Sequence, residues 1–188
     1  MIIDFVRHGQ SEANKHNIIQ GQYDSPLNEI GKQQALDLRE KIDNDYDLIL
    51  SSPLSRAKDT ATIALQVDER DSKFRKLDGL MEINFGKYQN QAVSKENQDL
   101  FMKIREDPNF NEHEGETGSQ FQRRCSDVFD EIVHVIQSEK LEKVIVFSHG
   151  GVIKTIIHRI LKFEKVFFDN TDITRIKFEN GRWTLVKV

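Results

Sequence analysis

Two histidines stand in similar surroundings near opposite ends of this 188-residue chain. His8 and His149 each follow an apolar run, and each precedes a glycine. A neutral imidazole can attack phosphorus and form a phosphohistidine. Because cationic neighbours such as Arg7 repel the imidazolium form, we expect a lowered pKa that keeps His8 uncharged near neutral pH. His149 would then donate a hydrogen bond to the phosphoryl oxygens.

A phosphoryl group also needs cationic and proton-donating partners. Its negative charge is spread over several oxygens, and the planar guanidinium groups of Arg7 and Arg56 can grip such oxygens in pairs. Gly150 and Gly151 offer backbone amides that can come close to a bound oxyanion. Glu82 lies among apolar neighbours, and partial burial raises a carboxyl pKa, so we expect it to protonate the leaving alkoxide. Together these residue types predict phosphoryl transfer.

Short buried strands are the elements that must position these side chains. Continuous apolar runs are typical of the strands of a parallel sheet. Ligands of such sheets bind beyond the carboxyl ends of the strands, and the candidate residues follow the predicted strands closely. Four such strands are predicted, at Ile2–Val6, Asp47–Leu50, Phe74–Leu77 and Val144–Phe147.

Helical patterns alternate with these strands. Apolar residues spaced three and four positions apart predict amphipathic helices. Ser52 is expected to cap the helix that carries Arg56, with Pro53 in its first helical position. Ser119 with Gln122 resembles a capping box at the start of the longest helix. The four apolar stripes run over residues 31–42, 54–65, 121–136 and 153–161.

The C-terminal region has a different pattern. Asn180-Gly181 predicts a tight hairpin turn between strands at Ile173–Phe178 and Trp183–Val188. At least one of these strands should run antiparallel to the rest. The whole pattern predicts the α/β class: a three-layer α/β/α sandwich with a mostly parallel central sheet.

One segment, Ile83–Gly118, is less regular than the rest. It is rich in polar residues, with a predicted short helix at Lys95–Glu106. Such an excursion is often a lid or a specificity segment, although a tolerated surface insertion is the alternative. At roughly 150 residues per domain, residues 1–188 are expected to form a single domain.

Composition excludes several classes of protein. The formal net charge of −4 disfavours a nucleic-acid binder. The single cysteine, Cys125, cannot form an internal disulfide and is expected to pack in the core, which fits a reducing compartment such as the cytoplasm. The N-terminus lacks a signal-peptide pattern, and no apolar run approaches the length of a membrane span. The sequence does not indicate an oligomeric state.

Five blocks of sequence, in order, carry a resemblance to a known family. The chain resembles the histidine phosphatase superfamily, in the branch shared by phosphoglycerate mutases and related phosphatases. One Arg-His-Gly alone would be weak, but the five together are highly specific. The blocks are Val6–Asn14, Gln20–Gly31 with Gln34-Ala35, Ser51–Ala57, Leu80–Glu82 with Phe85-Gly86, and Ser148–Gly151.

The resemblance implies a phosphoglycerate mutase-like fold and specific roles for these residues. It implies that His8 is phosphorylated, that Glu82 donates the proton, and that neither a metal nor another cofactor is needed. The implied phosphate- and substrate-binding set is Arg7, Ser11, Asn14, Gln20, Gly21, Arg56, His149 and Gly150. Lys87–Asn90 departs from the aromatic-Glu-Gly sequence that often follows Phe85-Gly86, and the chain is shorter than typical phosphoglycerate mutases.

Four functions remain open at this point. The first is a phosphatase that acts on a small phosphorylated metabolite, and the second is a mutase that returns the phosphoryl group to another hydroxyl. The short excursion favours the phosphatase, because a mutase must exclude water. An inactive phospho-ligand-binding module conflicts with the intact reactive residues, and a zinc hydrolase lacks paired metal-ligand spacing. Residues expected to be structural or solvated are His16, His113, His134, His158 and Arg123-Arg124.

Overall fold

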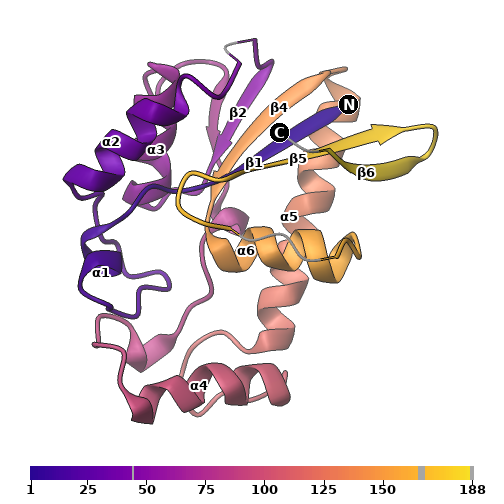
Figure 1. Ribbon diagram of the computed structural model, residues 1–188. Coiled ribbons are helices and arrows are strands. Elements are labelled where there is room, and N and C mark those ends of the chain that lie inside the picture. Colours follow the sequence, from indigo (N-terminus) through magenta and orange to yellow (C-terminus); the bar gives the residue numbers. More distant parts are fainter. Residues whose placement is uncertain (44, 165–167, 187–188) are drawn as a thin grey trace.

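A computed structural model describes residues 1–43, 45–164 and 168–186, without the side chains of residues 96, 100 and 105. Its centre is a six-stranded mixed sheet in the order β3-β2-β4-β1-β5-β6 (Figure 1). The predicted strands are present within a residue or two. Their bounds are β1 (Ile2–Arg7), β2 (Leu48–Ser51), β3 (Phe74–Lys76), β4 (Lys143–Ser148), β5 (Ile173–Glu179) and β6 (Arg182–Val186).

Strands β1 to β4 pair in parallel, so their carboxyl ends meet at one edge of the sheet. The register places Arg7 opposite Ser148 and Phe147 opposite Ser51. The residues that follow β1, β2 and β4 therefore emerge side by side. This edge is where the sequence predicted the reactive residues to converge.

Helices cover both faces of the sheet, which confirms the predicted three layers (Figure 1). Odd and even positions of each strand face opposite sides, so Phe5 and Val6 enter different cores. One core lies against α5 (Gly118–Ser138) and the helix that begins with α6 (Gly150–Lys154). The other lies against α2 (Glu29–Leu38) and α3 (Ser55–Leu65).

Two predicted helix starts are wrong. Helix α3 begins at Ser55, because Ser52 still belongs to the sheet edge: its amide donates to the carbonyl of Phe147. The Ser52 hydroxyl accepts the amide of Leu54, the residue before the helix, at 3.3 Å and lies 2.8 Å from Nε2 of His149. At α5, the capping box uses Thr117 and its N3 residue Gln120, two residues earlier than expected.

The antiparallel part of the sheet matches its prediction. Strand β5 pairs with β1, and β6 pairs with β5, in antiparallel fashion. Asn180 and Gly181 form the turn with φ values of 53° and 77°, the left-handed backbone that this two-residue hairpin requires. Residues 187–188 of the expected last strand lie outside the described residues.

The excursion at 83–118 contains the predicted helix, α4 (Lys95–Glu106), which lies beyond the carboxyl edge of the sheet, at the foot of Figure 1. A short helix, α1 (Glu12–Lys15), precedes a loop at the same end of the molecule. Backbone hydrogen bonds join that loop to the excursion: Ile19 donates to Gln91 and accepts from Asn90, both at 2.8 Å. The excursion is therefore attached to the site by its backbone.

A buried ionic cluster lies near the opposite end of the strands. The Asp4 carboxylate, on β1, accepts hydrogen bonds from the Arg175 guanidinium and from the Tyr46 hydroxyl, all at 2.7 Å. Burial and the bond to Asp4 raise the pKa of Tyr46. In the part of the chain that is described, no helix is both long and apolar enough to cross a membrane.

Candidate active site

His8 is the first residue after β1 and is almost completely buried, with 4% of its surface exposed. Its Nδ1 lies 2.7 Å from the carbonyl oxygen of Gly9. Since a carbonyl oxygen can only accept, Nδ1 carries the proton and Nε2 keeps its lone pair. Burial, followed by the charges of Arg56 and Arg7, lowers the pKa of His8 well below its usual value. The expected direction of the shift is confirmed, although burial outweighs the predicted effect of the arginines.

His149 follows β4 and lies next to His8, with the two ring centroids 5.1 Å apart. Its Nε2 is 2.8 Å from the Ser52 hydroxyl, and its Nδ1 has no partner among the described residues. Burial, and then the charge of Arg56, lowers the pKa of His149 well below its usual value. A neutral His149 can donate from only one ring nitrogen. If Ser52 donates to Nε2, the proton sits on Nδ1 and can reach a bound anion.

Two arginines present unpaired donors to the same place. Arg7 ends β1, Arg56 lies in the first turn of α3, and the Nε atom of each is buried without a partner among the described residues. The Nη atoms of Arg56 donate to the carbonyls of Tyr23 and Gly21 at 3.0 and 2.7 Å. Burial lowers the pKa of Arg56 to about 10, so it stays cationic at neutral pH. Buried donors without partners are costly in a folded protein, and an anion would satisfy them.

Glu82, in the loop after β3, lines the same cavity as His8. Its Oε1 accepts the amide of Ile83 and its Oε2 accepts the amide of Gly151, both at 3.0 Å. The carboxyl group is thus held by two backbone donors in a fixed orientation. The Gly151 amide, which the sequence suggested for an oxyanion together with that of Gly150, is used here by Glu82.

A cavity of about 380 Å³ unites most of the predicted site. Ser11 and His149 are not among its lining residues: His149 is completely buried, and the Ser11 hydroxyl contacts the side-chain oxygens of Gln20 and Asn14 at 2.7 and 3.1 Å. The predicted residues that line the cavity are Arg7, His8, Asn14, Gln20, Gly21, Arg56, Glu82 and Gly150. Excursion residues Phe85, Val93 and Phe101 complete its wall.

Two further residues, which the sequence did not single out, bind the backbone of His8 and Gly9. The Thr60 hydroxyl accepts the Gly9 amide at 2.9 Å and donates to the Arg56 carbonyl at 2.6 Å. Asn170 donates to the carbonyl of His8 at 2.7 Å. Thr60 lies one helical turn after Arg56, a spacing that could have suggested contact, whereas Asn170 lies in a loop that carries no such signal.

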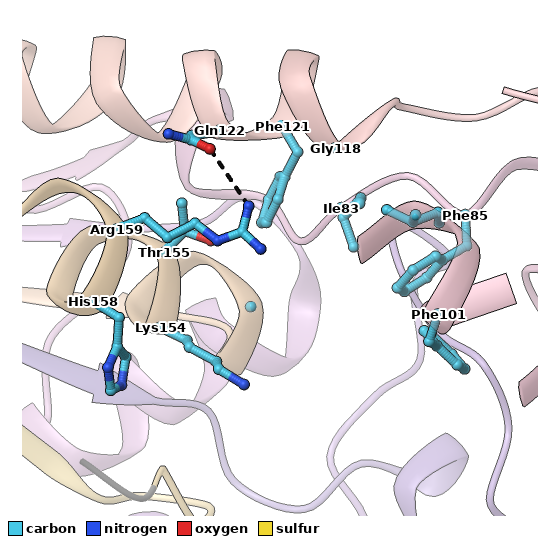
Figure 2. Close-up of a pocket in the computed structure, with 12 residues that line it drawn as sticks. Ile83, Phe85, Phe101, Gly118, Phe121, Gln122, Lys154, Thr155, His158 and Arg159 are labelled. Carbon is cyan, nitrogen blue, oxygen red and sulfur yellow. Dashed lines mark hydrogen bonds between the residues drawn. The ribbon is translucent and has the colours of Figure 1, made fainter. Parts of the chain in front are cut away.

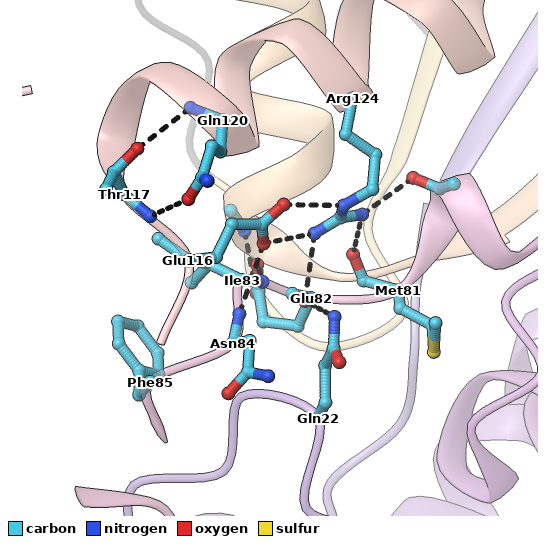
Figure 3. Close-up of polar contacts among 12 residues, drawn as sticks. Gln22, Met81, Glu82, Ile83, Asn84, Phe85, Glu116, Thr117, Gln120 and Arg124 are labelled. Carbon is cyan, nitrogen blue, oxygen red and sulfur yellow. Dashed lines mark hydrogen bonds and ion pairs between the residues drawn. The ribbon is translucent and has the colours of Figure 1, made fainter. Parts of the chain in front are cut away.

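Arg124 contradicts the prediction of a solvated helix face. Its guanidinium forms a two-pronged ion pair with Glu116, at 2.8 and 2.7 Å, and donates to the carbonyls of Gly79, Met81 and Glu82 (Figure 3). Burial acts to lower the pKa of Arg124, but the bonds to Glu116 outweigh it and the net shift is upward. Arg124 therefore fixes the backbone that carries Glu82.

Sequence comparison identifies the family to which this site belongs. Residues 3–188 match the histidine phosphatase superfamily (branch 1). The chain belongs to the histidine phosphatase superfamily. Among its relatives is a metal-independent phosphoserine phosphatase of Arabidopsis thaliana, 32% identical, with 97% of this chain and 79% of the relative covered.

Solved structures of histidine phosphatases share the fold. One is a mutant phosphoserine phosphatase of Entamoeba histolytica in complex with phosphoserine, with a TM-score of 0.81, 27% identity and coverage of 99% of this chain and 95% of the other. Another is a phosphoglycerate mutase of Bacillus anthracis, with a TM-score of 0.80, 26% identity and coverage of 100% and 92%. The predicted family, its α/β fold and its assignment as a phosphatase-type enzyme are confirmed.

The buried histidines make stability depend on pH. Their pKa values are lowered in the folded protein, whereas the unfolded chain takes up protons near pH 6.5. The stability that they contribute is therefore present above pH 6.5 and is lost as the pH falls below it. Between pH 7.5 and 5.5 we expect the free energy of unfolding to drop by about 2–3 kcal/mol from this pair.

Urea unfolding in a phosphate-free buffer measures this loss. The double variant His8→Gln/His149→Gln should show a flatter profile over the same interval. His134→Gln, at an exposed position, is the matched control and should keep the slope of the wild type. A double variant whose stability falls as steeply as that of the wild type would contradict the assignment.

Replacing Arg124 tests whether this residue fixes the loop that carries Glu82. Arg124→Gln removes the ion pair and leaves the Glu116 carboxylate, 14% exposed, without its counter-ion. We expect a loss of about 3–5 kcal/mol in stability and a fall in kcat of about tenfold or more, as the carboxyl group of Glu82 loses its position. Steady-state assays with p-nitrophenyl phosphate, well below the unfolding temperature, measure the second effect. Arg123→Gln is the neighbouring exposed control. Equal kcat in both variants would show that Arg124 does not position Glu82.

Proposed function

We propose that this histidine phosphatase hydrolyses phosphomonoesters of small metabolites through a phosphohistidine at His8. The observation that carries the proposal is the state of the imidazole. Nδ1 donates to Gly9, so Nε2 carries the lone pair in a residue that lines the cavity. An uncharged imidazole with a fixed tautomer is a nucleophile that needs no separate base.

The phosphoryl group is held by the donors around His8. We assign Arg7, Arg56 and His149 to its oxygens, because each keeps a buried nitrogen without a partner among the described residues. Asn14, Gln20, Gly21 and Gly150 line the same cavity and complete the binding set. Ser11 acts indirectly, through its bonds to Asn14 and Gln20.

The reaction proceeds in two displacements. Nε2 of His8 forms a bond to phosphorus while the bond from phosphorus to the ester oxygen breaks, and Glu82 gives its proton to the departing alkoxide. A water molecule then attacks the phosphohistidine, its proton passes to the Glu82 carboxylate, and phosphate leaves with His8 restored. General acid catalysis of this kind contributes about 10²–10⁴-fold to the rate.

Hydrolysis is favoured over transfer to a second hydroxyl by the excursion at 83–118. The described excursion residues that line the cavity, Phe85, Val93 and Phe101, carry no side-chain donor that would retain a doubly phosphorylated intermediate. The relative named as a metal-independent phosphoserine phosphatase supports hydrolysis of a small phosphorylated metabolite without a metal. A mutase remains the alternative, given the similarity to a solved phosphoglycerate mutase. The buried free thiol of Cys125 supports a cytoplasmic location.

The proposed nucleophile is tested by replacing it. His8→Ala should reduce turnover of p-nitrophenyl phosphate to below about one percent, since it removes the nitrogen on which the proposed intermediate forms. Alkaline quenching of the wild type during turnover, followed by mass spectrometry, should place the phosphoryl group on the peptide that contains His8. The control His134→Ala should keep full activity. A phosphoryl group on another residue would exclude the proposed mechanism.

Phosphatase and mutase differ in the fate of the phosphoryl group. With 3-phosphoglycerate as substrate, we expect inorganic phosphate to be released at the same rate with and without 2,3-bisphosphoglycerate, in the presence of EDTA. Phosphate release and 2-phosphoglycerate are measured in the same reaction. Formation of 2-phosphoglycerate that depends on the bisphosphate would instead establish a mutase, and binding without either product would establish a ligand-binding module.

A further inference from the structure

A second hollow adjoins the phosphate-binding cavity. We call it the side chamber; its volume is about 230 Å³, and its walls include Ile83, Ile104 and Phe121 (Figure 2). It shares Phe85, Phe101 and Gly151 with the cavity that holds His8. Since a cavity of about 150 Å³ binds benzene, the side chamber has room for an aromatic ring with a substituent.

The position of Glu82 indicates what enters the side chamber. Under the proposed function, on which this inference rests, the leaving oxygen must lie within reach of the Glu82 carboxyl group. That group accepts the amide of Gly151, a residue that lines both hollows. The leaving oxygen therefore lies where the two hollows meet, and the alcohol that it carries extends into the side chamber.

The lysine and the arginine that line the chamber come from one segment, the end of α6 and the π-helix that continues it. Lys154 ends α6, and Arg159 lies in the π-helix Thr155–Ile160 that continues it. Figure 2 shows the Lys154 side chain extending from its helix toward the open space in front of Phe101. Arg159 and Gln122 both line the chamber, and the Arg159 guanidinium donates a long hydrogen bond, at 3.4 Å, to the Gln122 side chain. None of the described lining residues is acidic.

The π-helix accounts for this placement. The amide of Leu161 donates to the carbonyl of Ile156, five residues back, so the turn is wider than an α-helical one. Lys154, His158 and Arg159 all line the chamber as a result. Single π-helical turns are rare and are found often at functional sites.

We infer that the side chamber binds the alcohol part of the substrate, and that the preferred substrates are phosphomonoesters of aromatic alcohols with an anionic group at the far end. Phe85, Phe101 and Phe121 contact the ring, and Lys154 and Arg159 bind the distal anion. Phosphoserine fits this chamber less well, because its alcohol part is small and lacks an aromatic ring. Its ammonium group also offsets the charge of the neighbouring carboxylate, so the two cations gain no net attraction.

Three aryl phosphates with nearly the same leaving group separate charge from reactivity: p-cresyl phosphate, 4-(carboxymethyl)phenyl phosphate and tyramine O-phosphate. We expect kcat/KM to be about tenfold higher for the carboxylate than for the neutral ester, about 1.4 kcal/mol. The ammonium ester and O-phosphoserine should both fall below the neutral ester. Equal kcat/KM values for the three aryl esters would overturn the inference.

Variants assign the effect to the chamber. In Lys154→Gln/Arg159→Gln, the ratio of kcat/KM between the carboxylate and neutral esters should fall from about tenfold to near one. Phe101→Ala should lower kcat/KM for p-cresyl phosphate relative to O-phosphoserine by about tenfold. Met102→Ala is the control on the same helix, exposed and outside both hollows. A double variant that keeps the tenfold ratio would also overturn the inference.

These outcomes are distinct from failure of the proposed function. If the wild type hydrolyses neither the four esters nor p-nitrophenyl phosphate and 3-phosphoglycerate, or if His8→Ala hydrolyses them as fast as the wild type, the proposed function fails and the inference fails with it. If p-nitrophenyl phosphate is hydrolysed through His8 but none of the four esters is, only the inference fails. If all four are hydrolysed through His8 without regard to ring or charge, only the side chamber assignment is lost.

Discussion

Backbone hydrogen bonds between β1 and β4 hold Arg7 opposite Ser148, and this register places the next residue of each strand, His8 and His149, side by side. Because parallel strands point the same way, both histidines leave the sheet at the same edge. A slip of one residue would turn one of them toward the opposite face. The central residues of both strands are buried, so the two apolar cores that pack against their alternate faces oppose such a slip.

The positive charge of the site depends on the hydrogen-bond partners of Arg56, which are backbone carbonyls. Arg56 is only 1% exposed, and its guanidinium donates to the carbonyls of Gly21 and Tyr23. A carboxylate would have stabilised the buried cation more strongly, but it would also have cancelled its charge. Carbonyl partners orient the group and leave the positive charge available to a phosphoryl oxygen. Arg124 shows the opposite arrangement, since its charge is balanced by Glu116 and it serves to hold backbone in place.

The sequence predicted the sheet edge and the residues on it because their signals are local. A buried strand followed by Arg7-His8 or Ser148-His149 can be recognised within ten residues. Arg124 was misjudged because it was grouped with its exposed neighbour Arg123, although it stands three residues after Phe121 and four before Val128, on the apolar face of α5. That spacing would have indicated a half-buried arginine. Its partner Glu116 depends on the path of the excursion, which local patterns do not define.

The loop after α1 and the excursion are joined by a short antiparallel bridge, in which Ile18 pairs with Ala92 and Ile19 exchanges bonds with Asn90 and Gln91. Each of the two bridged segments contributes residues to the cavity: Ile19 and Gln20 from the loop after α1, and Val93 from the excursion. An insertion or deletion in one segment must therefore displace the other, and both walls would shift together. Divergence in substrate preference along this lineage is then constrained to paired changes in loop length, or to side-chain replacements that leave the bridge intact.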